Sequence, residues 1–279
     1  KNKVAATLYC KMAINKGDKS ATKLYSAIIC DDDKVSIDNN DLHYLKIAVE
    51  DGNPAGMFKY ANMLYYNHDN EDSNKREAVR YCKMAVDKGD SNAMNLYGQM
   101  LFDGDAVSIN KEEGIRYIKM SIDKGNSHAM NKFGLMLQNG EGVEMSKEDA
   151  IVYFKMAISK GNTDAMLNYG LLILNDNENK INNEAIYYIK MAVEKGNTDA
   201  MLQYGQILLQ KECDEEKKEE AMSLFIMAAN RGNVTAMLKC GDLFQNGDII
   251  EANIDEARHY FKMASDNGNS YGKMKYFWL

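Results

Sequence analysis

Residues 87–98 read Asp87-Lys88-Gly89-Asp90-Ser91-Asn92-Ala93-Met94-Asn95-Leu96-Tyr97-Gly98, and variants of this stretch recur along the whole chain. Its first glycine returns every 35 to 37 residues, at Gly17, Gly52, Gly89, Gly125, Gly161, Gly196, Gly232 and Gly268. An Asn or Asp follows each of these glycines. Self-similarity at such a period is typical of solenoids, in which each unit packs against its neighbours. We therefore expect one continuous array rather than separate globular domains.

The residues before each repeat glycine predict a helix, here called helix B. In the copy that ends at Gly89, an apolar stripe at helical spacing consists of Ala78, Tyr81, Cys82 and Ala85. The glycine then supplies a left-handed residue that ends the helix, and the following Asn or Asp caps the next helix. The single proline, Pro54, follows Asn53 at a first helical position, where proline is well tolerated.

The second predicted helix of each repeat, helix A, runs from residue 91 to about residue 102 in the same copy. Its apolar positions are Met94, Tyr97 and Leu101. Two small positions recur beside them: Ala93 with Gly98, Ala129 with Gly134, Ala165 with Gly170, and Ala200 with Gly205. Glycine inside a helix costs about 1 kcal/mol relative to alanine. Its recurrence therefore indicates that neighbouring helices approach closely at this position.

The repeat pattern divides the 279 residues into three parts. Residues 1–17 form a half-repeat with helix B alone, residues 18–268 form seven A–B pairs, and residues 269–279 form a terminal helix A or cap. Because the chain begins with Lys1 within the pattern, we expect it to be part of a longer protein. At the other end Phe277 occupies the small position, which fits either a terminal cap or a helix that continues.

Three motifs carry a family resemblance. They are Ala-Met-x-x-Tyr/Phe-Gly-x-x-Leu, Asn-Gly-x-Gly-Val and Ala-x-x-Tyr-x-x-Met-Ala-x-x-x-Gly-Asn, most complete in residues 126–161. The sequence resembles the Sel1-like repeat, a relative of the tetratricopeptide repeat, over essentially its whole length. The resemblance implies an all-α fold, an α-solenoid of antiparallel helix pairs stacked into a right-handed superhelix. It also implies a role as an adaptor in protein complexes.

Charge and hydropathy exclude two classes of partner. The net charge of −7 and the pI of about 5.3 argue against nucleic acid, since phosphate binding needs clustered positive charge. No apolar run approaches the roughly 18–20 residues that cross a bilayer, so we expect no membrane insertion.

The five cysteines occupy positions that favour buried free thiols. Cys10 and Cys82 stand where other repeats carry Leu, Ile or Phe, and Cys240 stands where others carry Tyr or Phe. No Cys-x-x-Cys spacing occurs. Free cysteine behaves as a small hydrophobe, so we expect a reducing compartment and a cytoplasmic location. A redox or metal role is the alternative.

No motif for catalysis, a metal or a cofactor is apparent. The histidines His43, His68, His128 and His259 are scattered over different repeats without the spacing of a metal site. The run of acidic residues 31–33 lacks the glycine and the distal glutamate of a calcium loop. Asn233 begins a formal glycosylation sequon but stands at the helix-cap position. We expect no enzymatic activity, no metal and no cofactor.

We interpret the chain as a non-catalytic scaffold or adaptor for a protein partner. The alternative is a regulatory or targeting module of a larger enzyme, such as a kinase, whose catalytic domain lies outside these residues.

The resemblance to the tetratricopeptide fold also implies where a partner binds, because helix A lines the concave face of that fold. We count positions from each repeat glycine and assign offsets 3, 6, 10 and 13 to this face. The predicted binding residues are Asn92, Asn95, Gln99, Phe102, His128, Asn131, Leu135, Gln138, Leu167, Leu171, Leu174, Leu202, Gln206, Leu209 and Leu238. They predict a polar groove that gives way to an exposed apolar one, suited to an extended or helical peptide. The alternative is that the leucines merely close contacts between successive helices A.

Overall fold

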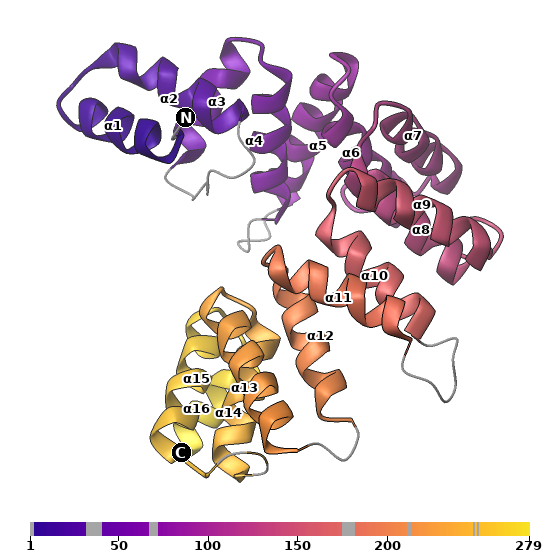
Figure 1. Ribbon diagram of the computed structural model, residues 1–279. Coiled ribbons are helices and arrows are strands. Elements are labelled where there is room, and N and C mark those ends of the chain that lie inside the picture. Colours follow the sequence, from indigo (N-terminus) through magenta and orange to yellow (C-terminus); the bar gives the residue numbers. More distant parts are fainter. Residues whose placement is uncertain are drawn as a thin grey trace. The chain divides into compact units, whose positions relative to one another are not determined.

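The structure, a computed structural model, describes residues 3–31, 41–66, 72–174, 182–210, 214–247, 249 and 251–279. In this part of the chain every regular element is an α-helix, and successive helices form side-by-side pairs (Figure 1). The chain forms two compact units, Lys1–Tyr153 and Phe154–Leu279. The all-α solenoid of helix pairs that the sequence predicts is confirmed, whereas the handedness of the superhelix and the single-domain division stay predictions.

The first unit begins with one helix and continues with A–B pairs. Its helices are α1 (Lys3–Asn15), α2 (Lys19–Asp31), α3 (Leu42–Glu50), α4 (Pro54–Tyr66), α5 (Asp72–Asp87), α6 (Ser91–Asp103), α7 (Lys111–Asp123), α8 (Ser127–Asn139) and the first half of α9 (Lys147–Ser159). In the repeat pattern α1 is a helix B, the even-numbered helices are A and the odd-numbered ones are B. The two helices of a pair, such as α4 with α5 and α6 with α7, pack against each other.

The second unit continues the same alternation of helices A and B. It contains the second half of α9 and then α10 (Thr163–Leu174), α11 (Asn183–Glu194), α12 (Thr198–Leu208), α13 (Glu215–Asn230), α14 (Val234–Asn246), α15 (Ile254–Asp266) and α16 (Ser270–Trp278). Pro54 begins α4, as the sequence predicts. At the end of the chain Phe277 and Trp278 are 73% and 85% exposed. Whether this stretch is a terminal helix A or a cap stays a prediction.

The junctions between repeats have the predicted geometry. All eight repeat glycines have a positive φ, between 76° and 93°. The residue after each glycine caps the next helix through its side chain, as where Asn197 Oδ1 accepts the N–H of Ala200 at 2.8 Å. The same bond at Asn233, at 2.9 Å to Ala236, explains the sequon there as a cap.

The cap side chains also join neighbouring repeats, which the sequence analysis missed. In three caps the Nδ2 atom donates, at 2.7 Å, to the side chain at the second position of the preceding helix A: Asn126 to Asn92, Asn197 to Asp164, and Asn233 to Asp199. Each carboxamide thus accepts a bond from its own helix and donates one to the repeat before it. This double use explains why asparagine prevails over aspartate at the cap.

The glycine at the second small position of helix A lies against a large, buried residue of helix B in the same pair. A Cβ atom on Gly98 would lie 2.7 Å from the carbonyl oxygen of Gly114 and 2.9 Å from Ile118 Cγ1. On Gly205 it would lie 2.6 Å from the ring of Phe225. Real Cβ atoms do not make such short contacts, so the predicted close approach of the helices is confirmed.

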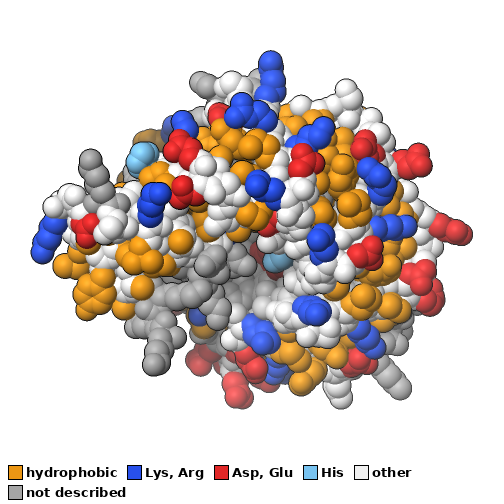
Figure 2. Space-filling model, turned by 90° about the horizontal axis from the view of Figure 1, so that it is seen from above, with side chains coloured by type: hydrophobic (Ala, Val, Ile, Leu, Met, Phe, Trp, Pro, Cys, Tyr) orange, Lys and Arg blue, Asp and Glu red, His pale blue; other side chains and the backbone are white. Residues whose placement is uncertain are grey.

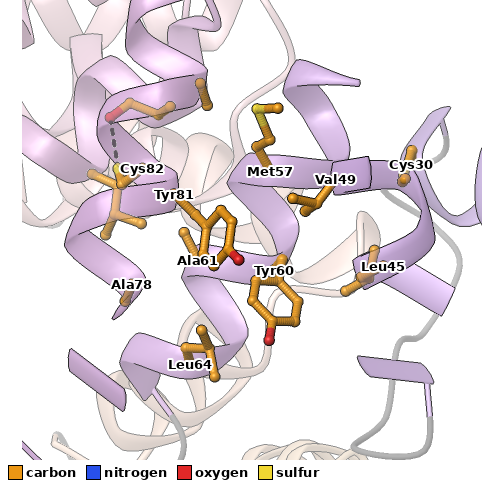
Figure 3. Close-up of a cluster of buried hydrophobic side chains, with 14 of the residues drawn as sticks. Cys30, Leu45, Val49, Met57, Tyr60, Ala61, Leu64, Ala78, Tyr81 and Cys82 are labelled. Atoms are coloured by element: carbon orange, nitrogen blue, oxygen red, sulfur yellow. Dashed lines mark hydrogen bonds between the residues drawn. The ribbon is translucent and has the colours of Figure 1, made fainter. Parts of the chain in front are cut away.

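Aromatic pairs fill the space between helices A and B beside these contacts. Tyr60 and Tyr81 meet edge to face with ring centroids 5.0 Å apart in the cluster that Figure 3 shows. Corresponding edge-to-face pairs are Tyr25–Tyr44, Tyr97–Tyr117, Phe133–Tyr153 and Tyr169–Tyr188. Such pairs contribute about 0.5–1.5 kcal/mol beyond the area that they bury.

Lysines on helix B lie over the aromatic ring of the next helix A. The Nζ atoms lie 5.1 to 5.3 Å from the ring centroids in the pairs Lys119–Phe133, Lys155–Tyr169 and Lys190–Tyr204. Hydrogen bonding to the tyrosine hydroxyl raises the pKa of both Lys155 and Lys190. These cation–π contacts join successive repeats on the helix B side.

Replacing Gly98 by leucine is expected to lower the free energy of unfolding by about 3 kcal/mol, because the side chain overpacks the contact with Gly114 and Ile118. Chemical denaturation of the purified chain measures this loss. Arg76→Ala, at an exposed position on α5, is the control and should change stability by less than about 0.5 kcal/mol. Equal stability of Gly98→Leu and the parent would contradict the packing account.

The double role of the cap predicts that Asn197→Asp destabilises the chain by about 1–2 kcal/mol at pH 7. The new carboxylate still caps α12, but it cannot donate and it faces Asp164. The loss should shrink as the pH falls towards about 4, where carboxylates take up protons.

Asp90→Asn is the matched control for this change. The second position of the preceding helix A, α4, is Ala55, which has no side-chain acceptor for the new carboxamide. The free energy of unfolding of Asp90→Asn should therefore differ little from that of the parent. A penalty for Asn197→Asp that is absent, or equal at pH 4 and pH 7, would refute the bond between repeats.

Candidate functional site

Three consecutive helices A of the first unit, α4, α6 and α8, border a groove of about 420 Å³. Its lining residues are Phe58, Asn62, Tyr66, Asn92, Asn95, Leu96, Gln99, His128, Asn131, Lys132 and Leu135. On each helix these residues are spaced by three or four positions, so they lie on one face. The small positions of the same helices face helix B, so the groove uses a face that the pair leaves free.

The groove is rich in carboxamides and lacks carboxylates among its described lining residues. Five of the eleven residues are Asn or Gln, Lys132 and His128 supply basic groups, and the others are apolar or aromatic. The Oδ1 atom of Asn95 is buried and has no hydrogen-bond partner in the described part of the chain. Asn92 is held by its bond from Asn126. The site therefore presents donors and acceptors together, beside apolar surface.

Six of the predicted binding residues line this groove: Asn92, Asn95, Gln99, His128, Asn131 and Leu135. The other two from these helices, at offset 13, do not line it. Phe102 is buried, with the Nζ atom of Lys111 5.2 Å from its ring, so the expectation that it is exposed is wrong. It lies in the last turn of α6, where the ring packs against Gly142. Gln138 is half-buried, and its Oε1 atom has no partner among the described residues.

The predicted apolar surface in the second unit is only partly exposed. Leu167 and Leu202 are 7% and 5% exposed and belong to one core cluster, so the expectation that they form an exposed groove is wrong. Helices that pack 8–10 Å apart bring leucines at such positions into contact and exclude water. The remaining predicted residues are half-buried: Leu171, Leu174, Gln206, Leu209 and Leu238. Whether any of them binds a partner stays a prediction.

Two groups of groove residues were not predicted from the sequence. The first group, Phe58, Asn62 and Tyr66, belongs to α4, to which the counting from the glycine was not applied. Counting from Gly52 places Phe58 and Asn62 at offsets 6 and 10, so the signal was present. The second group, Leu96 and Lys132, stands at offset 7, one residue after a predicted position.

The described thiols are buried singly in the core. Cys10, Cys30, Cys82 and Cys240 are buried as free cysteines, and burial raises the pKa of both Cys82 and Cys240 to about 12. The described residues contain no group of three or more His, Cys, Asp or Glu side chains that could hold a metal ion. Residues 32 and 33 of the acidic run, His68 and Cys213 lie outside the described residues.

The surface mixes charges of both signs. On the face that Figure 2 shows, basic and acidic side chains alternate with hydrophobic ones and do not gather by sign. In the described part of the chain, no helix is both long enough and apolar enough to span a bilayer.

The sequence profile of the Sel1 repeat matches six consecutive segments, residues 54–90, 91–126, 127–162, 163–197, 198–233 and 234–269. The chain belongs to the Sel1 repeat family. Each matched segment of this Sel1 repeat chain contains one helix A, one helix B and the glycine junction that follows. Proteins of this family are generally protein-interaction scaffolds, and the solenoid is typically non-catalytic.

Solved structures share this fold. A Sel1 repeat protein from Oxalobacter formigenes is 25% identical, with a TM-score of 0.64 over 82% of this chain and 95% of that one. A protective antigen from uropathogenic Escherichia coli is 17% identical, with a TM-score of 0.57 over 97% and 66%. An immunity protein from Pseudomonas aeruginosa is also 17% identical, with a TM-score of 0.62 over 78% and 83%. No curated protein sequence matches the Sel1 repeat chain significantly.

Burial of the thiols predicts that Cys82 and Cys240 resist alkylation by iodoacetamide at pH 8 in the folded chain, because the reactive thiolate is scarce and inaccessible. Peptide mapping by mass spectrometry after brief treatment measures the modified fraction. The same treatment in urea, which should modify both thiols fully, is the control. Rapid modification of either thiol in the native chain would contradict a core role.

Proposed function

We propose that this Sel1 repeat chain is a non-catalytic interaction scaffold, and that the groove across α4, α6 and α8 binds a segment of a partner protein. The observation that carries the proposal is the groove itself, lined by corresponding positions of three consecutive helices A. These positions are not needed for packing within an A–B pair, because the small and aromatic positions already provide that contact. Their mixture of carboxamide and apolar side chains is typical of a surface that recognises a peptide.

The proposal includes a reducing compartment such as the cytoplasm. Support comes from the burial of Cys10, Cys30, Cys82 and Cys240 in hydrophobic surroundings, where a thiol acts as an apolar side chain.

Selection from a random dodecapeptide library displayed on phage, with the whole chain as bait, provides a test that needs no known partner. The selected peptides should bind in the groove, so Asn95→Glu and Asn131→Glu should each weaken their binding by about tenfold or more through bulk and desolvated charge. Fluorescence polarisation with synthetic copies of the peptides measures the affinity.

Gln203→Glu is the matched control, because Gln203 is a half-buried carboxamide on α12, outside the groove. Melting curves of all variants establish that they fold. If the selected peptides bind Asn95→Glu and Asn131→Glu as tightly as they bind the parent chain, the binding surface lies elsewhere.

A further inference from the structure

The chemistry of the groove identifies its ligand more closely. We infer that the groove binds an extended, acidic segment of a polypeptide, held through its main chain by the carboxamides of α4, α6 and α8. This inference rests on the proposed function, because it names the class of peptide for the same groove. It follows from the carboxamides, from the imbalance of charge among the lining residues and from the span of the three helices.

The carboxamides suit a main chain whose N–H and C=O groups are still free. Each Asn or Gln side chain carries donors and an acceptor on one rigid group, which pair with the N–H and C=O of a peptide unit. An extended segment presents both groups to a binding surface, whereas an α-helix uses them internally. Asn95 lines the groove, and its buried Oδ1 atom has no hydrogen-bond partner in the described part of the chain.

The charge of the lining residues favours an acidic segment. The whole chain has 41 Asp and Glu residues and a net charge of −7. Among the eleven described lining residues there is no carboxylate, whereas Lys132 and His128 are both present. A groove that combines a lysine with carboxamides attracts carboxylates and repels basic segments.

The span of the groove sets the length of the segment. Packed helices lie about 8–10 Å apart, so three of them extend over roughly 16–20 Å. An extended chain advances about 3.3 Å per residue, and roughly five to six residues would cross the three helices. Side chains of such a segment alternate between two sides, so one set can lie against the half-buried Phe58 and Leu135 while the other points away.

The dodecapeptide selection described above tests the inference through the sequences that it yields. Peptides whose binding depends on Asn95 and Asn131 should contain about twice the library's proportion of Asp and Glu. Lys132→Gln should weaken their binding by about tenfold, through loss of a charged hydrogen bond. Lys239→Gln, at the corresponding position of α14 in the second unit, is the matched control and should leave affinity unchanged.

Main-chain recognition is tested by N-methylation of the central residues of the tightest peptide, one at a time. Removing an N–H that a carboxamide accepts should weaken binding by about tenfold or more at two or more positions. Replacing the acidic residues of the peptide by Asn and Gln tests the role of charge without altering the protein. This test therefore remains decisive even where the Lys132→Gln variant does not fold.

The outcomes separate this inference from the proposed function. Groove-dependent peptides that are neutral or basic, or that tolerate every N-methyl group, would overturn the inference and leave the groove as the binding site. Binding that ignores Asn95 and Asn131 would overturn both. Acidic peptides that need free N–H groups and Lys132 would support both.

Discussion

The close contact between helix A and helix B in each pair determines the rest of the architecture. A glycine on helix A meets a large, fully buried residue on helix B, as in the pairs Gly98–Ile118, Gly170–Ile189, Gly205–Phe225 and Gly241–Phe261. The glycine costs about 1 kcal/mol of helix propensity relative to alanine, which the packing of the large side chain offsets. Because helix B always covers the same side of helix A, the opposite side remains available along the stack.

Two polar contacts hold successive pairs together, and each varies in step with its partner position. Aspartate replaces asparagine at the cap of α6, where α4 offers no side-chain acceptor at Ala55. On the other side of the repeat, Ile226 stands where most copies have a lysine, and the ring expected beneath it is replaced by Cys240. Both side chains belong to the apolar cluster of the second unit. The lysine of helix B and the aromatic ring of the next helix A are therefore replaced together, as expected if the two side chains contact each other directly.

The sequence predicted the helices and their junctions because glycine, cap and apolar spacing act locally in every copy. Repetition turns each weak signal into a strong one. The groove was predicted in part, since the offsets of Asn95 and Asn131 follow from helix geometry alone. The burial of Leu167 and Leu202 could not be predicted, because it depends on the distance between successive helices A. The sequence pattern specifies which side of a helix a residue occupies, but not how near the next helix comes.

Offset 6 shows how one backbone position serves two purposes. In the first unit it carries Phe58, Asn95 and Asn131, which line the groove. In the second unit it carries Leu167, Leu202 and Leu238, which join the core cluster or pack against it. The glycines and the Asn or Asp caps at the junctions recur in both units, so they do not determine this difference. The side chains at offsets 3, 6, 7 and 10 decide whether a stack of helices A becomes a polar groove or further core. The capacity to recognise a partner therefore lies in those positions, whose side chains differ between the two units.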